Sequence, residues 1–208
     1  MQSVALIDYG SGNLRSAEKA LIRAADGRAD IVVTDRPELI ARADRLVLPG
    51  VGAFAACMAA LEARDGVIEA MTEAVHMRAA PFLGICVGMQ LLATRGLEFG
   101  ETEGLGWIPG DVKRLEVDDP HLKIPHMGWN EVTPTGDGLL FPAPETMYFT
   151  HSFAFHPAET ADVAAIAEHG QRFAAAVQRG NMAGVQFHPE KSQAAGLALL
   201  VRFLEWRP

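Results

Sequence analysis

The first half of the chain alternates short apolar segments, rich in β-branched residues, with longer segments of helical pattern. We expect strands at 3–9, 30–34, 46–48 and 81–85, and helices at 14–25, 54–64, 67–78 and 87–94. Alternation of this kind sets strands parallel to one another and covers both faces of the sheet with helices. The pattern therefore predicts an α/β fold with an open, mostly parallel sheet flanked by helices.

The second half has a different pattern. From 106 to 186, strand-like pieces alternate with turns rich in Pro, Gly and Asp, such as those at 118–120 and 135–138. This indicates antiparallel or mixed strands added to the parallel sheet, with an amphipathic helix at 193–205 after them. No segment repeats another, and 208 residues fit one domain, so we expect a single domain over 1–208.

Composition excludes several functions. The net charge is −8 and no cluster of Lys and Arg offsets it, which argues against binding nucleic acid. No apolar run approaches the roughly 20 residues that span a bilayer, so we expect no membrane association. The first ten residues lack the basic start of an export signal, and the only cysteines are Cys57 and Cys86. Two thiols without a disulfide framework favour the cytoplasm.

Cys86 has the surroundings of a nucleophile. In open α/β sheets, ligands bind beyond the carboxyl ends of the strands, and Cys86 directly follows an apolar strand there. Gly84 and Gly88 flank it, as a sharp strand-to-helix turn requires. The start of a helix also stabilises thiolate, the reactive form. A buried cysteine in a tight turn remains the alternative. Cys57 lacks these features and is expected to pack in the core.

His188 and Glu190 supply the matching base and acid. His188 ends another apolar strand, and Pro189 separates it from Glu190. Imidazole is a natural proton acceptor for a thiol, and a carboxylate two residues later can orient the ring. The tripeptide alone is weak evidence. Together with a cysteine about a hundred residues earlier, it predicts a Cys-His-Glu triad.

Other motifs point to no cofactor. Gly10-Ser11-Gly12 lacks the third glycine of a dinucleotide fingerprint, because position 15 is Arg, and no P-loop occurs. The remaining histidines match no metal-binding spacing, so we expect no metal: they are His121, His126, His151, His156 and His169. His151 is expected to help shape the substrate pocket. Asp118 and Asp119 are interpreted as a solvated turn.

Taken together, these residues resemble class I glutamine amidotransferases, whose signature is G-x-C-x-G-x-Q with a distant H-P-E. The resemblance extends to the glutaminase subunits of imidazole glycerol phosphate synthases. The matching segments span nearly the whole chain: DYGSGN at 8–13, LPGVGAF at 48–54, PHMGWN at 125–130, YFTHSF at 148–153 and FHPEKSQ at 187–193.

The resemblance implies hydrolysis of glutamine through a thioester on Cys86. The oxyanion would be stabilised by backbone N–H groups of Val87 and of the segment around Val51 and Gly52, after a peptide flip near Val51. The glutamine pocket would be formed by Gly52, Gln90, Ser152 and Phe153, the last two mostly through their backbone.

The resemblance also implies a partner. Free ammonia is quickly protonated in water and stops being a nucleophile, so the family passes it to a partner without exposing it to solvent. That partner is a separate (β/α)8-barrel cyclase subunit, which makes imidazole glycerol phosphate in histidine biosynthesis. The residues that would form this interface are Asn13, Pro125, Met127, Trp129, Asn130 and Lys191. Met and Trp are common in interface cores. Ordinary packing in a loop-rich region is the alternative for these six.

Three other functions fit these residues less well. An amidase subunit serving another acceptor shares the triad but lacks the PHMGWN and HPEKSQ segments. A cysteine peptidase or small-molecule hydrolase on a similar sheet lacks the H-P-E spacing. A non-catalytic interaction subunit does not account for an intact triad.

Overall fold

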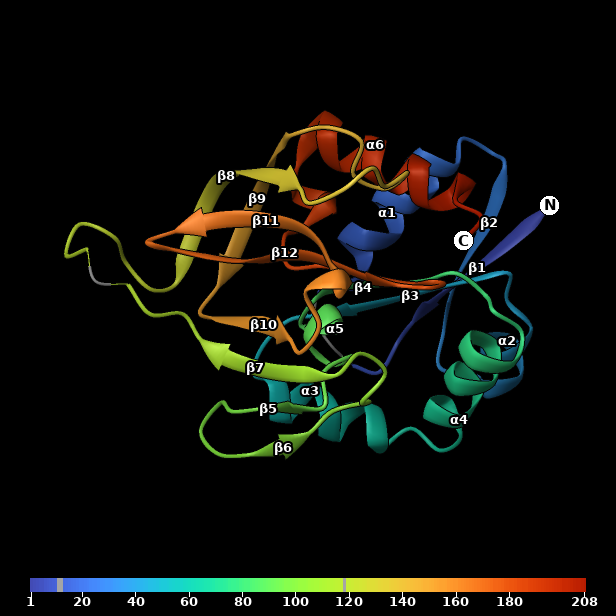
Figure 1. Cartoon of the computed structure of the whole chain (residues 1–208). Helices are drawn as coiled ribbons and strands as arrows, with labels where there is room; N and C mark the ends of the chain where they lie inside the picture. Colours follow the sequence, from blue (N-terminus) through green and yellow to red (C-terminus); the bar gives the residue numbers. More distant parts are fainter. Residues whose placement is uncertain (11–12, 118) are drawn as a thin grey trace.

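One large sheet organises the molecule (Figure 1). The computed structural model describes residues 1–10, 13–117 and 119–208, and in that part nine strands follow the order β2-β1-β3-β4-β13-β12-β11-β8-β9. Its first five strands are parallel to one another: β2 (Ala29–Thr34), β1 (Gln2–Ile7), β3 (Arg45–Gly50), β4 (Phe82–Cys86) and β13 (Met182–Val185). Ser11 and Gly12 of the glycine motif and Asp118 of the acidic turn lie outside the described residues.

The other strands of the large sheet are antiparallel to their neighbours: β12 (Gln171–Arg179), β11 (Val163–His169), β8 (His126–Pro134) and β9 (Glu145–His151). A second, four-stranded sheet lies beside the first: β10 (Phe153–Pro157), β7 (Gly110–Arg114), β5 (Arg95–Gly96) and β6 (Thr102–Glu103). The prediction of a mixed second half is confirmed, but the separate small sheet was not predicted.

Helices cover both faces of the large sheet (Figure 1). On one face lie α1 (Leu14–Ala25) and α6 (Gln193–Glu205), and on the other α2 (Pro37–Arg42), α3 (Phe54–Glu62) and α4 (Val67–Thr72). Every residue of β3 and β4 is buried, as expected for central parallel strands with helices on both sides. The α/β fold with a sheet flanked by helices is therefore confirmed, and the large sheet is mixed, with a parallel half and an antiparallel half.

Three helices differ from the prediction. The helix expected at 87–94 is only α5 (Val87–Gln90), because the carbonyls of Leu91, Leu92 and Ala93 accept N–H groups of residues 105–108 instead of continuing the helix. The helix expected at 67–78 changes after α4 into a π-helix over Glu73–Met77. Helix α2 was missed, since six residues are too few to show a clear period.

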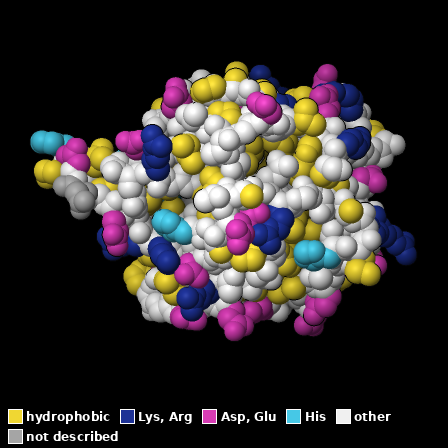
Figure 2. Space-filling view, in the orientation of Figure 1, with side chains coloured by type: hydrophobic (Ala, Val, Ile, Leu, Met, Phe, Trp, Pro, Cys, Tyr) yellow, Lys and Arg dark blue, Asp and Glu magenta, His cyan; other side chains and the backbone are white. Residues whose placement is uncertain are grey.

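Two short 3-10 helices complete the elements, at Thr160–Asp162 and Pro189–Lys191. In the described part of the chain, no helix has both the length and the apolar character needed to cross a membrane. On the face shown in Figure 2, acidic and basic side chains lie interspersed over the surface.

Candidate active site

Cys86 occupies a strained turn between β4 and α5. Its backbone has φ 55° and ψ −114°, outside the regions that residues with a side chain favour. A Cβ on Gly84 would lie 2.5 Å from the Gly88 carbonyl oxygen, and one on Gly88 would lie 1.9 Å from the Leu48 carbonyl oxygen. Glycine is therefore required on both sides of the turn, as the sequence pattern indicated.

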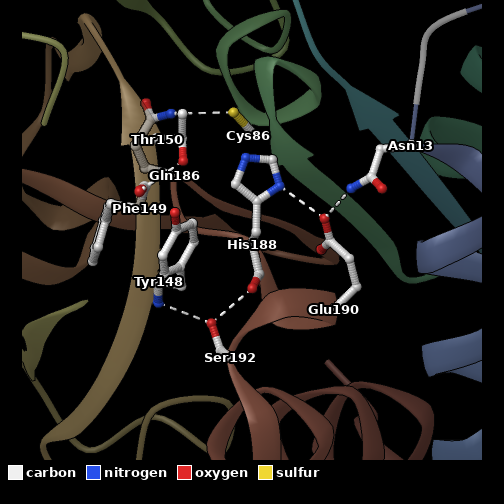
Figure 3. A network of polar contacts seen from close by, with 9 residues as sticks. All are labelled: Asn13, Cys86, Tyr148, Phe149, Thr150, Gln186, His188, Glu190 and Ser192. Atoms are coloured by element: carbon white, nitrogen blue, oxygen red, sulfur yellow. Dashed lines mark hydrogen bonds and ion pairs between the residues drawn. The ribbon is translucent and has the colours of Figure 1, made fainter. Parts of the chain in front are cut away.

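Strand pairing brings His188 to Cys86. Strands β4 and β13 are parallel neighbours, with Val185 opposite Ile85. Cys86 is one residue beyond that pair on its strand, and His188 is three beyond it on the other. Figure 3 shows the sulfur next to the imidazole ring. The Cys86 side chain is close enough to raise the pKa of the His188 ring.

Glu190 holds the opposite side of the ring. His188 Nδ1 donates to Glu190 Oε1 over 2.8 Å, and the two side chains are only 4% and 2% exposed. Asn13 Nδ2 donates to the same oxygen over 2.5 Å (Figure 3). This arrangement leaves Nε2 as the ring nitrogen that serves Cys86.

The pKa of His188 reflects opposing influences. Burial of the ring lowers the pKa, but the hydrogen bonds and negative charges of Cys86 and Glu190 outweigh it and raise the pKa to about 9. At neutral pH the ring therefore carries a proton that it can pass to a leaving group.

Ser192 fixes the turn that carries His188. Its hydroxyl donates to the His188 carbonyl over 2.7 Å and accepts the Tyr148 N–H over 2.9 Å. The His188 N–H in turn donates to the Tyr148 carbonyl over 2.9 Å. The histidine is thereby tied to β9, as Figure 3 shows.

A cavity of about 380 Å³ opens next to the sulfur. Its walls contain all the residues predicted for the oxyanion and glutamine sites, together with Glu98 and Thr150, which were not predicted. The lining residues are Val51, Gly52, Cys86, Val87, Gln90, Glu98, Pro125, Thr150, His151, Ser152, Phe153, His188 and Lys191. The Phe153 carbonyl in this wall accepts a hydrogen bond from Gln90 Nε2 over 3.0 Å.

Gln186 was missed by the sequence reasoning. It is fully buried, accepts a hydrogen bond from Gln90 Nε2 over 3.0 Å, and places its own Nε2 3.8 Å from Cys86 Sγ. A polar residue in the apolar run just before His188 was the available signal, because buried amides need partners. Glu98 and Thr150 carried no comparable signal.

The segment predicted to supply oxyanion donors faces Cys57. The Cys57 sulfur donates to the Val51 carbonyl over 3.3 Å, and Gly52 has φ +107°, a conformation that favours glycine. Cys57 is buried as predicted, but its thiol also holds this segment.

The six predicted interface residues fall into three groups. Met127 and Trp129 are 62% and 49% exposed on β8. Pro125 and Lys191 stand at the cavity. Asn13 bonds Glu190 within the active site, and Asn130 bonds the Glu168 carbonyl and a ring nitrogen of His126. The first two groups are exposed, and the two asparagines are partly buried.

Comparison with known proteins agrees with this geometry. The family model of class-I glutamine amidotransferases matches residues 5–205. The chain belongs to this family. It is 64% identical, over the full length of both chains, to a Caulobacter vibrioides protein named imidazole glycerol phosphate synthase subunit HisH. A relative with the same name from Rhodospirillum rubrum is 56% identical, with 99% of each chain covered.

Solved structures share the amidotransferase fold. One described as a glutamine amidotransferase has a TM-score of 0.73 at 19% identity, covering 97% of each chain. Another glutamine amidotransferase, from Thermotoga maritima, has a TM-score of 0.65 at 18% identity, covering 98% of this chain and 96% of its own. Among the described residues of this amidotransferase, no group of three or more His, Cys, Asp or Glu could hold a metal ion.

Proposed function

We propose that the chain hydrolyses glutamine to glutamate and ammonia, with Cys86 as nucleophile, His188 as acid and base, and Glu190 as the group that orients His188. The observation that carries this proposal is the meeting of Cys86 and His188 in one cavity, with Glu190 on the other ring nitrogen. A thiol, an imidazole and a carboxylate in this order form the arrangement that acyl transfer requires.

The reaction has two stages. The Cys86 sulfur attacks the carboxamide carbon of glutamine, and the carbonyl oxygen gains a negative charge. His188 gives its proton to the amide nitrogen, the C–N bond breaks, ammonia leaves and a thioester remains. His188, now neutral, takes a proton from water as the water oxygen attacks the thioester carbon. The C–S bond then breaks and glutamate is released, with Cys86 again a thiolate and His188 again protonated.

The cavity can hold the rest of glutamine. The backbone N–H of Val87 and a donor from the segment around Val51 and Gly52 would stabilise the oxyanion. Glu98 is the acidic group of the cavity wall, and a carboxylate there suits the α-ammonium group of the substrate. Gln90, Ser152 and Phe153 would complete the glutamine pocket.

We propose further that the ammonia goes to a (β/α)8-barrel cyclase subunit that makes imidazole glycerol phosphate in histidine biosynthesis. The names of the relatives support this, as does the position of Met127 and Trp129. These exposed apolar side chains point to one face of β8, and Met127 pairs across the strands with Thr150, which lines the cavity. A partner covering them would also cover the cavity mouth.

We propose that the chain works as a single domain in a heterodimer, in the cytoplasm and without a cofactor. No disulfide joins Cys57 to Cys86, which suits a reducing compartment. The proposed chemistry needs only the side chains named above and water.

The test is a pull-down with the candidate cyclase, followed by measurement of glutamate release with and without it. We expect Cys86→Ala to abolish release and to keep partner binding, because it removes only the attacking sulfur. Cys57→Ser, which keeps a donor for the Val51 carbonyl, is the matched control and should retain activity. Wild-type release from Cys86→Ala would rule out the assigned nucleophile.

A further inference from the structure

A line of hydrogen bonds joins β8 to the wall of the cavity. Asn130 Nδ2 lies 3.2 Å from His126 Nε2, and His126 Nδ1 lies 2.9 Å from His151 Nε2. His151 Nδ1 lies 2.9 Å from the Phe153 carbonyl oxygen. The two histidines are opposite each other on β8 and β9. We call these three contacts the histidine bridge.

The hydrogen bonds of the bridge all donate in the same direction, from Asn130 toward the Phe153 carbonyl. The Phe153 carbonyl can only accept, so His151 Nδ1 carries the proton. In a neutral ring Nε2 must then accept, so the proton between the histidines belongs to His126 Nδ1. His126 Nε2 is left to accept from the Asn130 amide. Both rings therefore have the proton on Nδ1, which is the less common tautomer in water.

The surroundings keep both rings neutral. His126 is 4% exposed and stacks against Phe149 and His169, with ring centroids 4.9 Å and 4.2 Å apart. Burial, with a smaller effect of His169, lowers the pKa of His126 to about 4. Burial likewise lowers the pKa of His151 to about 3, although its bond to the Phe153 carbonyl opposes this. Neither ring carries charge at neutral pH.

The far end of the bridge reaches substrate-facing groups. The Phe153 carbonyl accepts from His151 and also from Gln90 Nε2. The same Gln90 nitrogen donates to Gln186, whose amide approaches the Cys86 sulfur. The position of this carbonyl therefore determines where the Gln90 side chain lies in the cavity.

We propose that His126 and His151 are positioning residues for glutamine, whose bridge holds the Phe153 carbonyl and the Gln90 side chain in the geometry that binds the substrate. The inference rests on the proposed function, because it takes the cavity to be the glutamine site. Both histidines act through other groups and are not assigned a chemical step.

Three substitutions at His151 separate hydrogen bonding from packing. In His151→Asn, an amide N–H stands near the position of Nδ1 and keeps the donor to the Phe153 carbonyl. In His151→Gln, the amide stands near Nε2 and that donor is lost; in His151→Phe, the ring remains and both bonds are lost. His156→Phe, on β10 but outside the cavity, is the matched control.

The assay is steady-state glutamate release by the assembled synthase. We expect His151→Gln and His151→Phe to raise KM for glutamine about tenfold with a smaller change in kcat, because the lost bond positions the substrate. His151→Asn should stay within about threefold of wild type, since the donor is restored. An unchanged KM in His151→Phe, or equal damage in all three variants, would overturn the proposal.

Nuclear magnetic resonance of the full ¹⁵N-labelled chain tests the bridge apart from activity. We expect both His126 and His151 to show a protonated Nδ1 and an unprotonated Nε2 at neutral pH. A protonated Nε2 on either ring would overturn the proposal. If the wild-type complex released no glutamate, the proposed function would fail, and the tautomers would still decide whether the bridge exists.

Discussion

At the residue scale, the site depends on the proton that His188 carries. Burial lowers the pKa of its ring, but the hydrogen bonds and charges of Cys86 and Glu190, on opposite sides, raise the pKa to about 9. Because the pKa is raised, the protonated ring persists through neutral pH and is lost only as the pH rises through about 9. In the proposed reaction, loss of that proton would remove the acid that protonates the leaving ammonia.

This gives a prediction for pH dependence. In the complex, kcat/KM for glutamine should fall as the pH rises through about 9. Glu190→Gln removes one of the negative charges that raise the pKa of His188, so the fall in kcat/KM should move to lower pH.

Glu190→Gln should also slow turnover less than Cys86→Ala does, because it affects orientation and not bond formation. Unchanged turnover in Glu190→Gln would mean that another acidic group orients the His188 ring.

Some site residues could be predicted from the sequence because the residues next to them in the chain form a recognisable pattern, and others could not. Cys86 between two glycines and the His188-Pro189-Glu190 tripeptide are recognisable because neighbours in the chain carry the pattern. The bond from Asn13 to Glu190 and that from Gln186 to Cys86 join residues 177 and 100 positions apart. No local pattern encodes such contacts, so the sequence indicated neither the bond from Asn13 to Glu190 nor a place for Gln186 in the site.

At the element scale, the turn from β4 to α5 is held by close packing against β3. A Cβ added to Gly88 would lie 1.9 Å from the Leu48 carbonyl oxygen, and one added to Gly50 would lie 2.5 Å from the Gly88 backbone nitrogen. The helix that follows ends after Gln90, because the next carbonyls bond residues 105–108. The turn geometry was predictable from the glycines, but the early end of α5 depends on a distant loop.

Gly88→Ala tests this packing. The added Cβ would lie 1.9 Å from the Leu48 carbonyl oxygen, so the turn must shift and Cys86 with it. We expect a loss of about 1–3 kcal/mol in the free energy of unfolding, measured with urea, and loss of glutamate release. Gly136→Ala is the control, because nothing lies within 4 Å of its added Cβ. Equal stability in both variants would contradict the close contact.

At the scale of the whole molecule, the last strand of the parallel set lies in the middle of the sheet. Strand β13 pairs with β4 and with β12, and so joins the parallel half to the antiparallel half. This placement sets His188 beside Cys86 and puts β8 and β9 next to the cavity. The parallel class was predictable from strand–helix alternation. The small sheet was not, because β5 and β6 have only two residues each.

The outer face of β8 gives a prediction about the partner. Trp129 is half-exposed and meets Tyr148 edge to face, with centroids 5.7 Å apart. Trp129→Ala should weaken binding of the cyclase about thirtyfold or more, as expected for a central aromatic side chain, and reduce its stimulation of glutamate release. Leu139→Ala, at an exposed apolar residue beyond β8, is the control. Unchanged affinity for the cyclase in Trp129→Ala would show that the interface does not include Trp129.

The proposed reaction requires the Cys86 sulfur to form a bond with the carboxamide carbon of glutamine. Mass spectrometry can test it by treating the complex with a glutamine analogue that carries a diazoketone in place of the carboxamide. We expect one adduct per chain, on Cys86, which persists in Cys57→Ser and is absent from Cys86→Ala. An adduct on Cys57, or one that survives Cys86→Ala, would contradict it.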